Sequence, residues 1–215
     1  MFDVRNFSSA LNVNPKQLQM TNPMALANAL ADSELVQTTL AGRESGFEEL
    51  VRRYQRPIAA YVYRMVGDYD AALDLTQEVF IKVYASLSRY RPEFKFSTWI
   101  YKIAHNAAID HLRRHATREA VASSEEDRPE TTAETRRLSP EQESERTERC
   151  SEIEIVVQML PAPYRELILL RHSQDLSYEE IAEVTGLPLG TVKNRLFRAR
   201  EAMREHLMQR GITTP

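Results

Sequence analysis

The sequence predicts an all-α protein: two small helical domains joined by a flexible acidic linker, the C-terminal domain carrying a helix-turn-helix. Nearly every apolar pattern repeats at helical spacing, and none alternates convincingly as a strand would. A stretch with few apolar residues and many charges, 118–150, interrupts these patterns and predicts the linker. The residues after it end in the layout of a helix-turn-helix.

Composition places the chain among ordinary globular proteins. Hydrophobic residues make up 42% of its 215 residues and charged residues 27%. We find no apolar run long enough to cross a bilayer and no signal peptide, so we expect a cytoplasmic protein without membrane insertion. The single Cys150 excludes an internal disulfide and a multi-cysteine metal site.

The predicted elements follow in order. Residues 1–28 are Asn-rich and weakly patterned, which indicates a mobile leader. The N-terminal domain, 29–117, begins with apolar residues over 47–65 that predict one helix, or a pair bent near Pro57. Gly67 and Asp68 then turn the chain into a helix over 70–87, a loop follows over 90–95, and another helix covers 97–115. After the linker, the C-terminal domain, 151–210, starts with two short helices.

The segment 176–200 predicts the helix-turn-helix. Ser177 and Glu180 have the spacing of a capping box, and Gly186 supplies a left-handed helix end. The second helix, over 191–207, carries an apolar stripe: Val192, Leu196, Ala199, Met203 and Leu207. The residues off this stripe are free to meet DNA bases and phosphates: Lys193, Asn194, Phe197 and Arg198.

Charge supports a nucleic-acid partner locally, although the whole chain has a net charge of −3. Between Leu189 and Arg210 there are six Lys/Arg against two Glu, whereas 116–152 holds six Arg against eleven Asp/Glu. The alternative for the basic residues is the solvated face of an ordinary amphipathic helix.

The helix over 70–87 has two unlike sides. One side is apolar, and the opposite side gathers Asp70, Asp74, Gln77, Glu78 and Ile81. This side suits the docking of a basic partner, and a solvated acidic face is an equal alternative.

Aromatic residues gather just before a basic helix. Six of the chain's 17 aromatic residues lie between Tyr84 and Tyr101, and Lys102, Asn106 and Arg113 project together from the helix that follows. Exposed rings beside cations suit single-stranded nucleic acid, and we expect about half of these rings to be core instead. The histidines of this helix are predicted to be surface residues and not metal ligands: His105, His111 and His115.

Together these segments resemble an extracytoplasmic-function (ECF) sigma factor, a transcription initiation subunit of the sigma-70 family. DSELVQTTLAGRESGFEELVRRYQRPI resembles the start of the family, and DAALDLTQEVFIKVYASLSRY resembles its polymerase-binding helix. FSTWIYKIAHNAAIDHLRR resembles the promoter-melting helix, and LPLGTVKNRLFRAREAMREHL resembles the reader of the −35 element.

The resemblance implies roles for particular residues. The clamp helices of the polymerase β′ subunit would contact Asp74, Gln77 and Glu78. Single-stranded −10 DNA would meet Phe94, Phe96, Trp99, Lys102, Asn106 and Asp110, with a flipped base held in the loop 91–96. Duplex −35 DNA would meet Thr191, Lys193, Asn194, Phe197, Arg198 and Arg200, of which Thr191 and Arg200 touch phosphates. The chain departs from common family members at Asp110, where Asn is frequent, and at Lys193, where Arg is frequent.

The resemblance also implies partners: core RNA polymerase through its β′ and β subunits, promoter DNA, and an anti-sigma factor. It implies no catalytic residue, metal or cofactor in this chain. Two alternatives are a stand-alone helix-turn-helix regulator and an interaction module that retains a decayed helix-turn-helix. Neither requires the acidic set around Gln77 or the set Trp99, Lys102 and Asn106.

Overall fold

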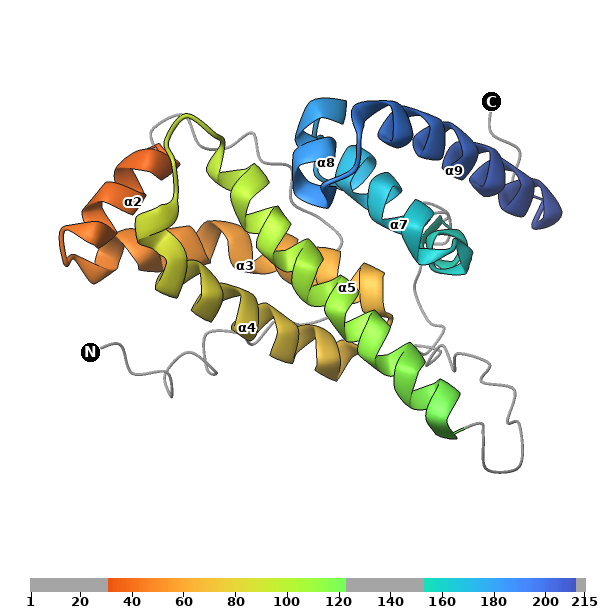
Figure 1. Ribbon diagram of the computed structural model, residues 1–215, viewed down its shortest axis with the longest axis horizontal. Helices are drawn as coiled ribbons and strands as arrows, with labels where there is room; N and C mark the ends of the chain where they lie inside the picture. Colours follow the sequence, from red (N-terminus) through yellow and green to blue (C-terminus); the bar gives the residue numbers. More distant parts are fainter. Residues whose placement is uncertain (1–30, 123–152, 212–215) are drawn as a thin grey trace, which may run out of the picture.

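The computed structural model describes residues 31–122 and 153–211, and within these ranges every regular element is a helix (Figure 1). The N-terminal half contains α2 (Asp32–Leu40), α3 (Glu44–Val66), α4 (Tyr69–Ser86), the 3-10 turn η2 (Leu87–Arg89) and α5 (Phe96–Ala122). The C-terminal half contains a helix over 153–159, α7 (Ala162–Ile168), its π-helical continuation η3 (Leu169–Ser173), α8 (Tyr178–Thr185) and α9 (Leu189–Gln209). The predicted all-α class is confirmed. The predicted leader, 1–28, and the linker residues 123–150 lie outside the described residues.

The helix α5 is longer than predicted. It continues to Ala122, through the first residues that the sequence assigned to the linker. The segment ATREAVA, 116–122, contains no Gly or Pro and consists mostly of residues that tolerate or favour a helix. Charge and low hydrophobicity marked this segment as linker, but neither property stops a helix that has already begun.

The helix α3 is continuous, although Pro57 lies inside it. A proline within a helix removes one backbone hydrogen bond and costs about 3 kcal/mol. Packing offsets this cost, because Ile58, Tyr61 and Val62 beyond the proline are fully buried. Of the two predicted outcomes, packing therefore selects one helix.

The turn between α3 and α4 forms as the sequence predicted. Gly67 has a φ of 80°, a left-handed conformation that ends α3, and the Asp68 side chain accepts a hydrogen bond of 2.7 Å from the Ala71 N–H. The predicted apolar side of this segment is buried in the core, with Leu87 in η2 and the other four residues in α4: Ala72, Leu75, Val79 and Val83. This burial fixes the rotation of α4 and turns its acidic side to solvent.

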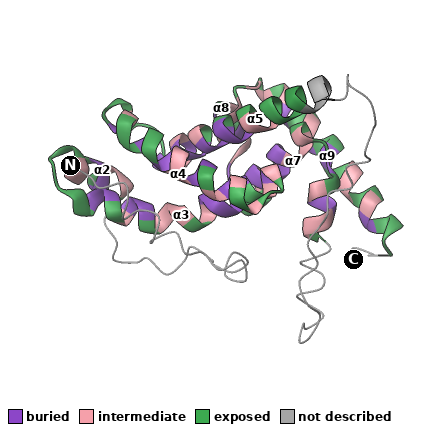
Figure 2. Cartoon of the chain, turned by 90° about the horizontal axis from the view of Figure 1, so that it is seen from below, coloured by how far each residue is buried: buried purple, intermediate pink, exposed green. Residues whose placement is uncertain are grey.

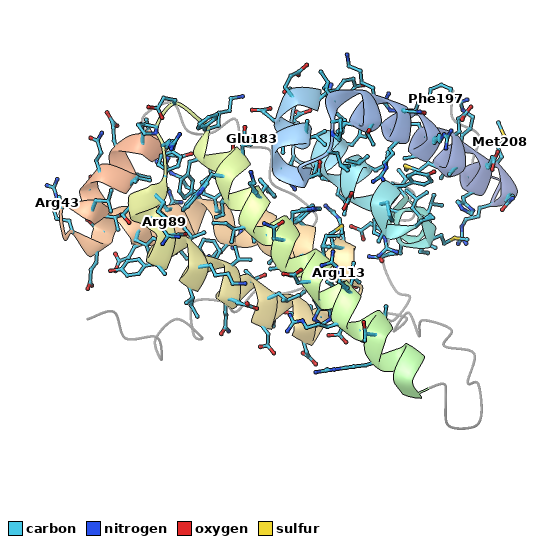
Figure 3. All side chains as sticks on the ribbon, viewed as in Figure 1. Arg43, Arg89, Arg113, Glu183, Phe197 and Met208 are labelled. Carbon is cyan, nitrogen blue, oxygen red and sulfur yellow. The ribbon has the colours of Figure 1, made fainter. Side chains whose placement is uncertain are left out.

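The helix-turn-helix also has its predicted caps. The Ser177 hydroxyl accepts from the Glu180 N–H at 3.1 Å, and the Glu180 carboxylate accepts from the Ser177 N–H at 2.7 Å. Gly186 has a φ of 70° and ends α8. The stripe of α9 packs inward, with Val192, Leu196 and Ala199 at most 1% exposed. The opposite side of α9 faces outward, where Figure 3 shows Phe197 and Met208 pointing away from the rest of the molecule.

Replacing Ser177 with alanine is expected to destabilise the C-terminal half by about 1 kcal/mol, because the α8 N-terminus loses its side-chain acceptor. Urea unfolding followed by circular dichroism measures this change. The substitution Ser177→Asp keeps an acceptor and should retain most of the stability. Equal loss in both variants would contradict the capping explanation.

The two halves pack against each other. Their buried apolar residues form one contiguous cluster that includes Tyr61 and Ile100 from the N-terminal half and Leu167 and Ile181 from the C-terminal half. In Figure 1 the helix α8 lies alongside α5, α7 also packs against α3, and Figure 2 shows buried residues on the sides of helices that face one another. The sequence predicted two bodies on a tether, and nothing in its periodicity indicated that they would share a core.

Candidate functional site

We call the solvent-facing side of α4, with Asp74, Gln77, Glu78 and Ile81, the docking face. Asp74 is exposed and the Gln77 and Glu78 side chains are half-buried. Ile81 is 52% exposed, so a large apolar side chain lies on the surface within the acidic set. Glu78 forms an ion pair of 2.6 Å with Lys82 one turn along. An exposed pair of this kind contributes only about 0.3–0.5 kcal/mol, so a partner's cation can replace Lys82 at little cost.

We call the outward side of α5, with Lys102, Asn106 and Asp110, the melting face. All three side chains are exposed and lie four residues apart along the helix, so they form one ascending row. Asp110 forms an exposed ion pair of 3.6 Å with Arg113. The carboxylate at this position therefore has a cation beside it, which reduces its repulsion of a phosphate.

The loop before α5 presents one exposed ring on a fixed backbone. Phe94 is 47% exposed, its N–H donates to the Arg91 carbonyl at 3.1 Å, and its own carbonyl accepts from the Tyr90 hydroxyl at 2.7 Å. The resemblance implies a DNA contact for Phe96, but this side chain is only 2% exposed. The centroid of its ring lies 5.3–5.6 Å from the centroids of three neighbouring rings: Tyr54, Tyr90 and Trp99. Trp99 is partly buried in the same cluster. Phe94 is thus the ring of this loop that is best placed to stack on a base. The buried Phe96 ring supports the loop by packing against Tyr90.

The prediction that all three histidines of α5 lie on the surface is wrong for His105. His105 is 6% exposed, and burial lowers its pKa to about 4. His111 is partly buried and His115 is exposed, and their rings stack with centroids 6.4 Å apart. His105 follows Tyr101 and precedes Ala108 at helical spacing on the buried side of α5, and this stripe was the sequence signal for its burial.

We call the outward side of α9 the reading face, and its predicted members lie together on it. Lys193, Asn194, Phe197, Arg198 and Arg200 are all exposed, and Thr191 is half-buried at the start of the helix. Phe197 is 60% exposed, so its ring is available for contact with a partner. The ring and its neighbouring cations offer an apolar contact for a thymine methyl group and donors for bases or phosphates.

Two features prepare this face for phosphates. Pro188 precedes α9 and has no side-chain acceptor to offer, so the first N–H groups of the helix have no side-chain cap. The Arg200 guanidinium donates to the Tyr178 hydroxyl at 3.4 Å, and Arg171 lies over the same ring at 5.4 Å. Tyr178 on α8, the first helix of the motif, thereby positions the guanidinium of Arg200 on α9, the second helix.

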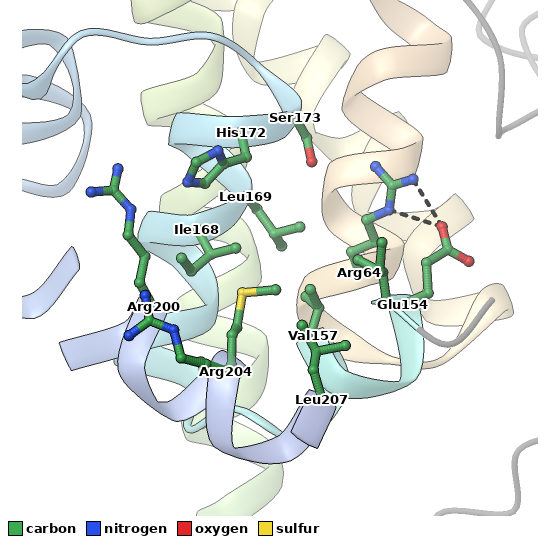
Figure 4. Close-up of a pocket in the computed structure, with 12 residues that line it drawn as sticks. Arg64, Glu154, Val157, Ile168, Leu169, His172, Ser173, Arg200, Arg204 and Leu207 are labelled. Carbon is green, nitrogen blue, oxygen red and sulfur yellow. Dashed lines mark hydrogen bonds and ion pairs between the residues drawn. The ribbon is translucent and has the colours of Figure 1, made fainter. Parts of the chain in front are cut away.

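A groove of about 570 Å³ lies on another side of the C-terminal half (Figure 4). Its floor is apolar, formed by Val157, Ile168, Leu169, Met203 and Leu207 together with Ile153. Arginines line its rim: Arg200 and Arg204 from α9, and Arg64 from α3, which pairs with Glu154 at 2.9 Å. An amphipathic helix with acidic residues matches such a lining.

Sequence reasoning missed a set of polar residues between the two halves. The Arg165 guanidinium, the Glu166 carboxyl and the Gln158 amide all contact the N-terminal half, and Glu166 is 6% exposed. In sequence these residues look like the polar side of an amphipathic helix, because the surface they meet belongs to a distant segment.

Residues 31–122 and 153–211 contain no group of three or more His, Cys, Asp or Glu side chains arranged to hold a metal ion. The helices in these ranges include none with the length and hydropathy needed to span a membrane.

Comparison with known proteins divides the chain at the same place as the fold. The family model for sigma-70 region 2 matches residues 50–118, which hold the docking and melting faces. The model for sigma-70 region 4 matches residues 152–203, which hold the helix-turn-helix and the reading face.

Relatives match along most of their length. The RNA polymerase sigma-H factor of Pseudomonas aeruginosa is 38% identical over 80% of this chain and 91% of its own. The ECF RNA polymerase sigma-E factor of Escherichia coli is 36% identical over 83% of this chain and 95% of its own, and the SigW factor of Bacillus subtilis is 34% identical over 77% and 91%.

Solved structures share the fold. The sigma factor RpoE of Bartonella quintana, in complex with the anti-sigma factor NepR, matches with a TM-score of 0.60 and 22% identity over 75% of this chain and 96% of that one. CnrH, in complex with the cytosolic domain of CnrY, also matches with a TM-score of 0.60 and 22% identity, over 84% and 99%. The chain belongs to the ECF sigma factors of the sigma-70 family, alternative sigma factors that bind core RNA polymerase and promoter DNA and direct transcription.

Proposed function

We propose that the three faces divide the work of promoter recognition. The observation that carries the proposal is their joint presence: an acidic face with an exposed Ile81, an exposed ring held on a fixed loop, and a basic face on the second helix of a helix-turn-helix. Each face suits a different partner chemistry, and an initiation subunit needs all three.

The docking face binds the clamp helices of the polymerase β′ subunit. Asp74 is exposed, Glu78 holds its cation only weakly, and the amide of Gln77 lies between them. Ile81, one turn beyond Gln77, adds an exposed apolar contact to the polar ones.

The reading face binds duplex −35 DNA. Base edges meet Lys193, Asn194, Phe197 and Arg198, while Thr191, Arg200 and the uncapped N-terminus of α9 meet phosphates. Lys193 has no bidentate fork, so we expect guanine to be read less sharply there than by arginine.

The melting face and the Phe94 loop hold single-stranded −10 DNA. Stacking on an aromatic ring stabilises a flipped base by about 1–3 kcal/mol, which offsets part of the cost of unpairing. Lys102 and Asn106 then hold the strand along α5, Asp110 sets a base preference, and Trp99 with Phe96 supports the loop.

The groove of the C-terminal half holds a helix of a protein partner. Its apolar floor and arginine rim fit an amphipathic acidic helix. We assign this helix to the β subunit in the active complex and to an anti-sigma factor in the inactive one.

The subunit contributes binding energy and no catalytic chemistry of its own, and it works in the cytoplasm beside the polymerase. Promoter opening is then driven by capture of the melted strand.

Transcription in vitro with sigma-free core polymerase tests this division of work. The native chain is expected to give a defined start site, and Gln77→Ala/Glu78→Ala should reduce that transcript at least tenfold, because the docking face loses its amide and one carboxylate. A matched control is Gln37→Ala/Glu48→Ala, which removes the same two groups from exposed positions on α2 and α3.

Two outcomes would contradict the proposal. Equal transcript from the native chain and the docking variant would remove the docking face from the polymerase interface. Specific binding of promoter fragments at full strength without polymerase would favour the stand-alone regulator.

A further inference from the structure

The loop before α5 contains a tight turn that its own sequence favours. Residues 91–95 are all exposed, and loops of this kind are usually mobile unless hydrogen bonds hold them. Pro92 stands at the second position of a β-turn, where its fixed φ favours the turn, and the Phe94 N–H closes the turn by donating to the Arg91 carbonyl at 3.1 Å. This backbone hydrogen bond fixes the turn itself, but it does not fix how the turn is set on the rest of the domain.

The Tyr90 hydroxyl supplies a second tie across this turn. It donates to the Phe94 carbonyl at 2.7 Å, and the Tyr90 N–H donates to the Leu87 carbonyl at 3.1 Å. The two ends of the exposed loop are thus joined by a side chain whose own backbone is anchored on η2. Burial and the nearby Asp32 and Glu93 carboxylates raise the pKa of Tyr90, so the hydroxyl keeps its proton and remains a donor.

A cluster of rings holds Tyr90 in place. The centroid of its ring lies 5.5 Å from that of Phe96 and 5.5 Å from that of Trp99, and the Phe96 centroid in turn lies 5.3 Å from that of Tyr54 on α3. Tilted and edge-to-face pairs at these separations are favourable beyond the area that they bury. Because Phe96 is 2% exposed, the cluster belongs to the close-packed core and gives Tyr90 a rigid support.

The far side of this ring cluster is tied to α2. The Tyr54 hydroxyl donates to the Asp32 carboxylate at 2.5 Å, and the Arg53 guanidinium donates to the same carboxylate at 2.8 Å. Asp32 is the first residue of α2, where a carboxylate also complements the helix dipole. A charged acceptor makes a stronger hydrogen bond than a neutral one, so Asp32 fixes the orientation of the Tyr54 ring against Phe96.

We infer that Tyr90 and Tyr54 are positioning residues for base capture. The Tyr90 hydroxyl holds the turn in the conformation that presents the Phe94 ring, and Tyr54, held by Asp32, supports the rings on which Tyr90 rests. A loop that is already ordered loses little further conformational freedom when a base stacks on it, so more of the stacking energy remains for opening the promoter. This inference rests on the proposed function for what the Phe94 ring does, whereas the order of the loop is a property of the free chain.

Amide hydrogen exchange in the free, full-length protein tests the order of the loop. Tyr90→Phe keeps the ring and its packing but removes the hydroxyl, so the turn should open more often and the Phe94 N–H should exchange at least threefold faster than in the native chain. Two-dimensional NMR of the isotope-labelled protein measures this rate. Tyr63→Phe is the matched control, because it removes a hydroxyl from α3 outside the ring cluster, and it should leave the rate unchanged.

A double-mutant cycle in the reconstituted holoenzyme separates positioning from general stability. Tyr90→Phe should reduce opening of a duplex promoter at least threefold and Tyr54→Phe at least twofold, whereas Tyr63→Phe should have no effect. In a chain that already carries Phe94→Ala, the Tyr90→Phe change should cause no further loss, because the ring that the hydroxyl positions is gone. A residue that only stabilised the N-terminal half would add its effect in both backgrounds. Permanganate reactivity of unpaired thymines measures opening.

The outcomes distinguish this inference from the proposed function. An unchanged exchange rate at Phe94 in the Tyr90→Phe protein would show that the hydroxyl does not order the turn, and it overturns the inference. Equal losses of opening with and without Phe94→Ala would show that Tyr90 acts on stability alone, which also overturns it. Faster exchange in Tyr90→Phe together with unaltered opening in Phe94→Ala confirms that the hydroxyl orders the loop and refutes the assignment of base capture to Phe94.

Discussion

Promoter-specific transcription is expected to fall on the order of 100-fold when Lys193 and Arg198 are both replaced with alanine. Both side chains are exposed on the reading face, and each lost base contact costs about 1–3 kcal/mol, or roughly tenfold for 1.4 kcal/mol. The expected loss is specific to sequence, so base changes in the −35 element should matter less to the variant than to the native chain. Transcription from promoters with single −35 substitutions measures this.

The matched control is Arg43→Ala/Arg89→Ala. It removes the same two positive charges from exposed positions, and Figure 3 shows both arginines on the N-terminal half, away from α9. If this control lost as much activity as the reading-face variant, long-range attraction would explain the effect and base reading would not. Arg200→Ala should instead weaken binding to all −35 sequences by the same factor, because it removes a phosphate contact and no base contact.

Replacing Phe94 and Asn106 with alanine is expected to reduce opening of a duplex promoter by roughly tenfold, while binding to a pre-melted template at saturating concentration stays near the native level. The lost stacking, about 1–3 kcal/mol, would otherwise offset the unpairing of the −10 bases. A pre-melted template needs no unpairing, so at saturating concentration it stays bound even when the stacking energy is lost. Permanganate footprinting of unpaired thymines measures opening, and a gel-shift assay measures binding.

Met208→Ala/Gln209→Ala is the control for this pair. It removes an exposed apolar side chain and an exposed amide from the C-terminal end of α9, beyond the residues that we assign to −35 DNA. Equal loss on duplex and pre-melted templates would show that Phe94 and Asn106 only bind the strand and take no part in opening it.

Local chemistry explains which parts of the fold could be predicted from sequence. The Ser177–Glu180 box and Gly186 lie within a few residues of the helix ends that they define, so their spacing alone indicated the helix-turn-helix. The stripe of α4 likewise placed Asp74 and Gln77 on the solvent side, because burial of one side of a helix fixes the other.

The rest depends on segments far apart in the chain. His105 and Glu166 are separated by 61 positions, and neither periodicity nor capping connects them. Phe96 is a second example. The sequence shows that aromatic residues are concentrated before α5, but it does not show which of these rings are buried in the core. The assignment of individual residues to DNA or polymerase remains a prediction that the experiments above test.

At the end of α3 the Arg64 and Met65 carbonyls accept hydrogen bonds from the other half of the molecule, from the Gln158 amide at 2.8 Å and the Arg165 guanidinium at 2.7 Å. This arrangement has a consequence for how the chain matures. A ribosome releases the N-terminal half first, at a stage when Gln158 and Arg165 have not yet been made. The carbonyls at the end of α3 must then be solvated by water, and that last turn frays more readily than the rest of the helix. The nascent protein therefore acquires its final stability only when synthesis is nearly finished. In a fragment that stops at residue 122, the last turn of α3 is expected to stay frayed, whereas in the intact protein it is held by the C-terminal half.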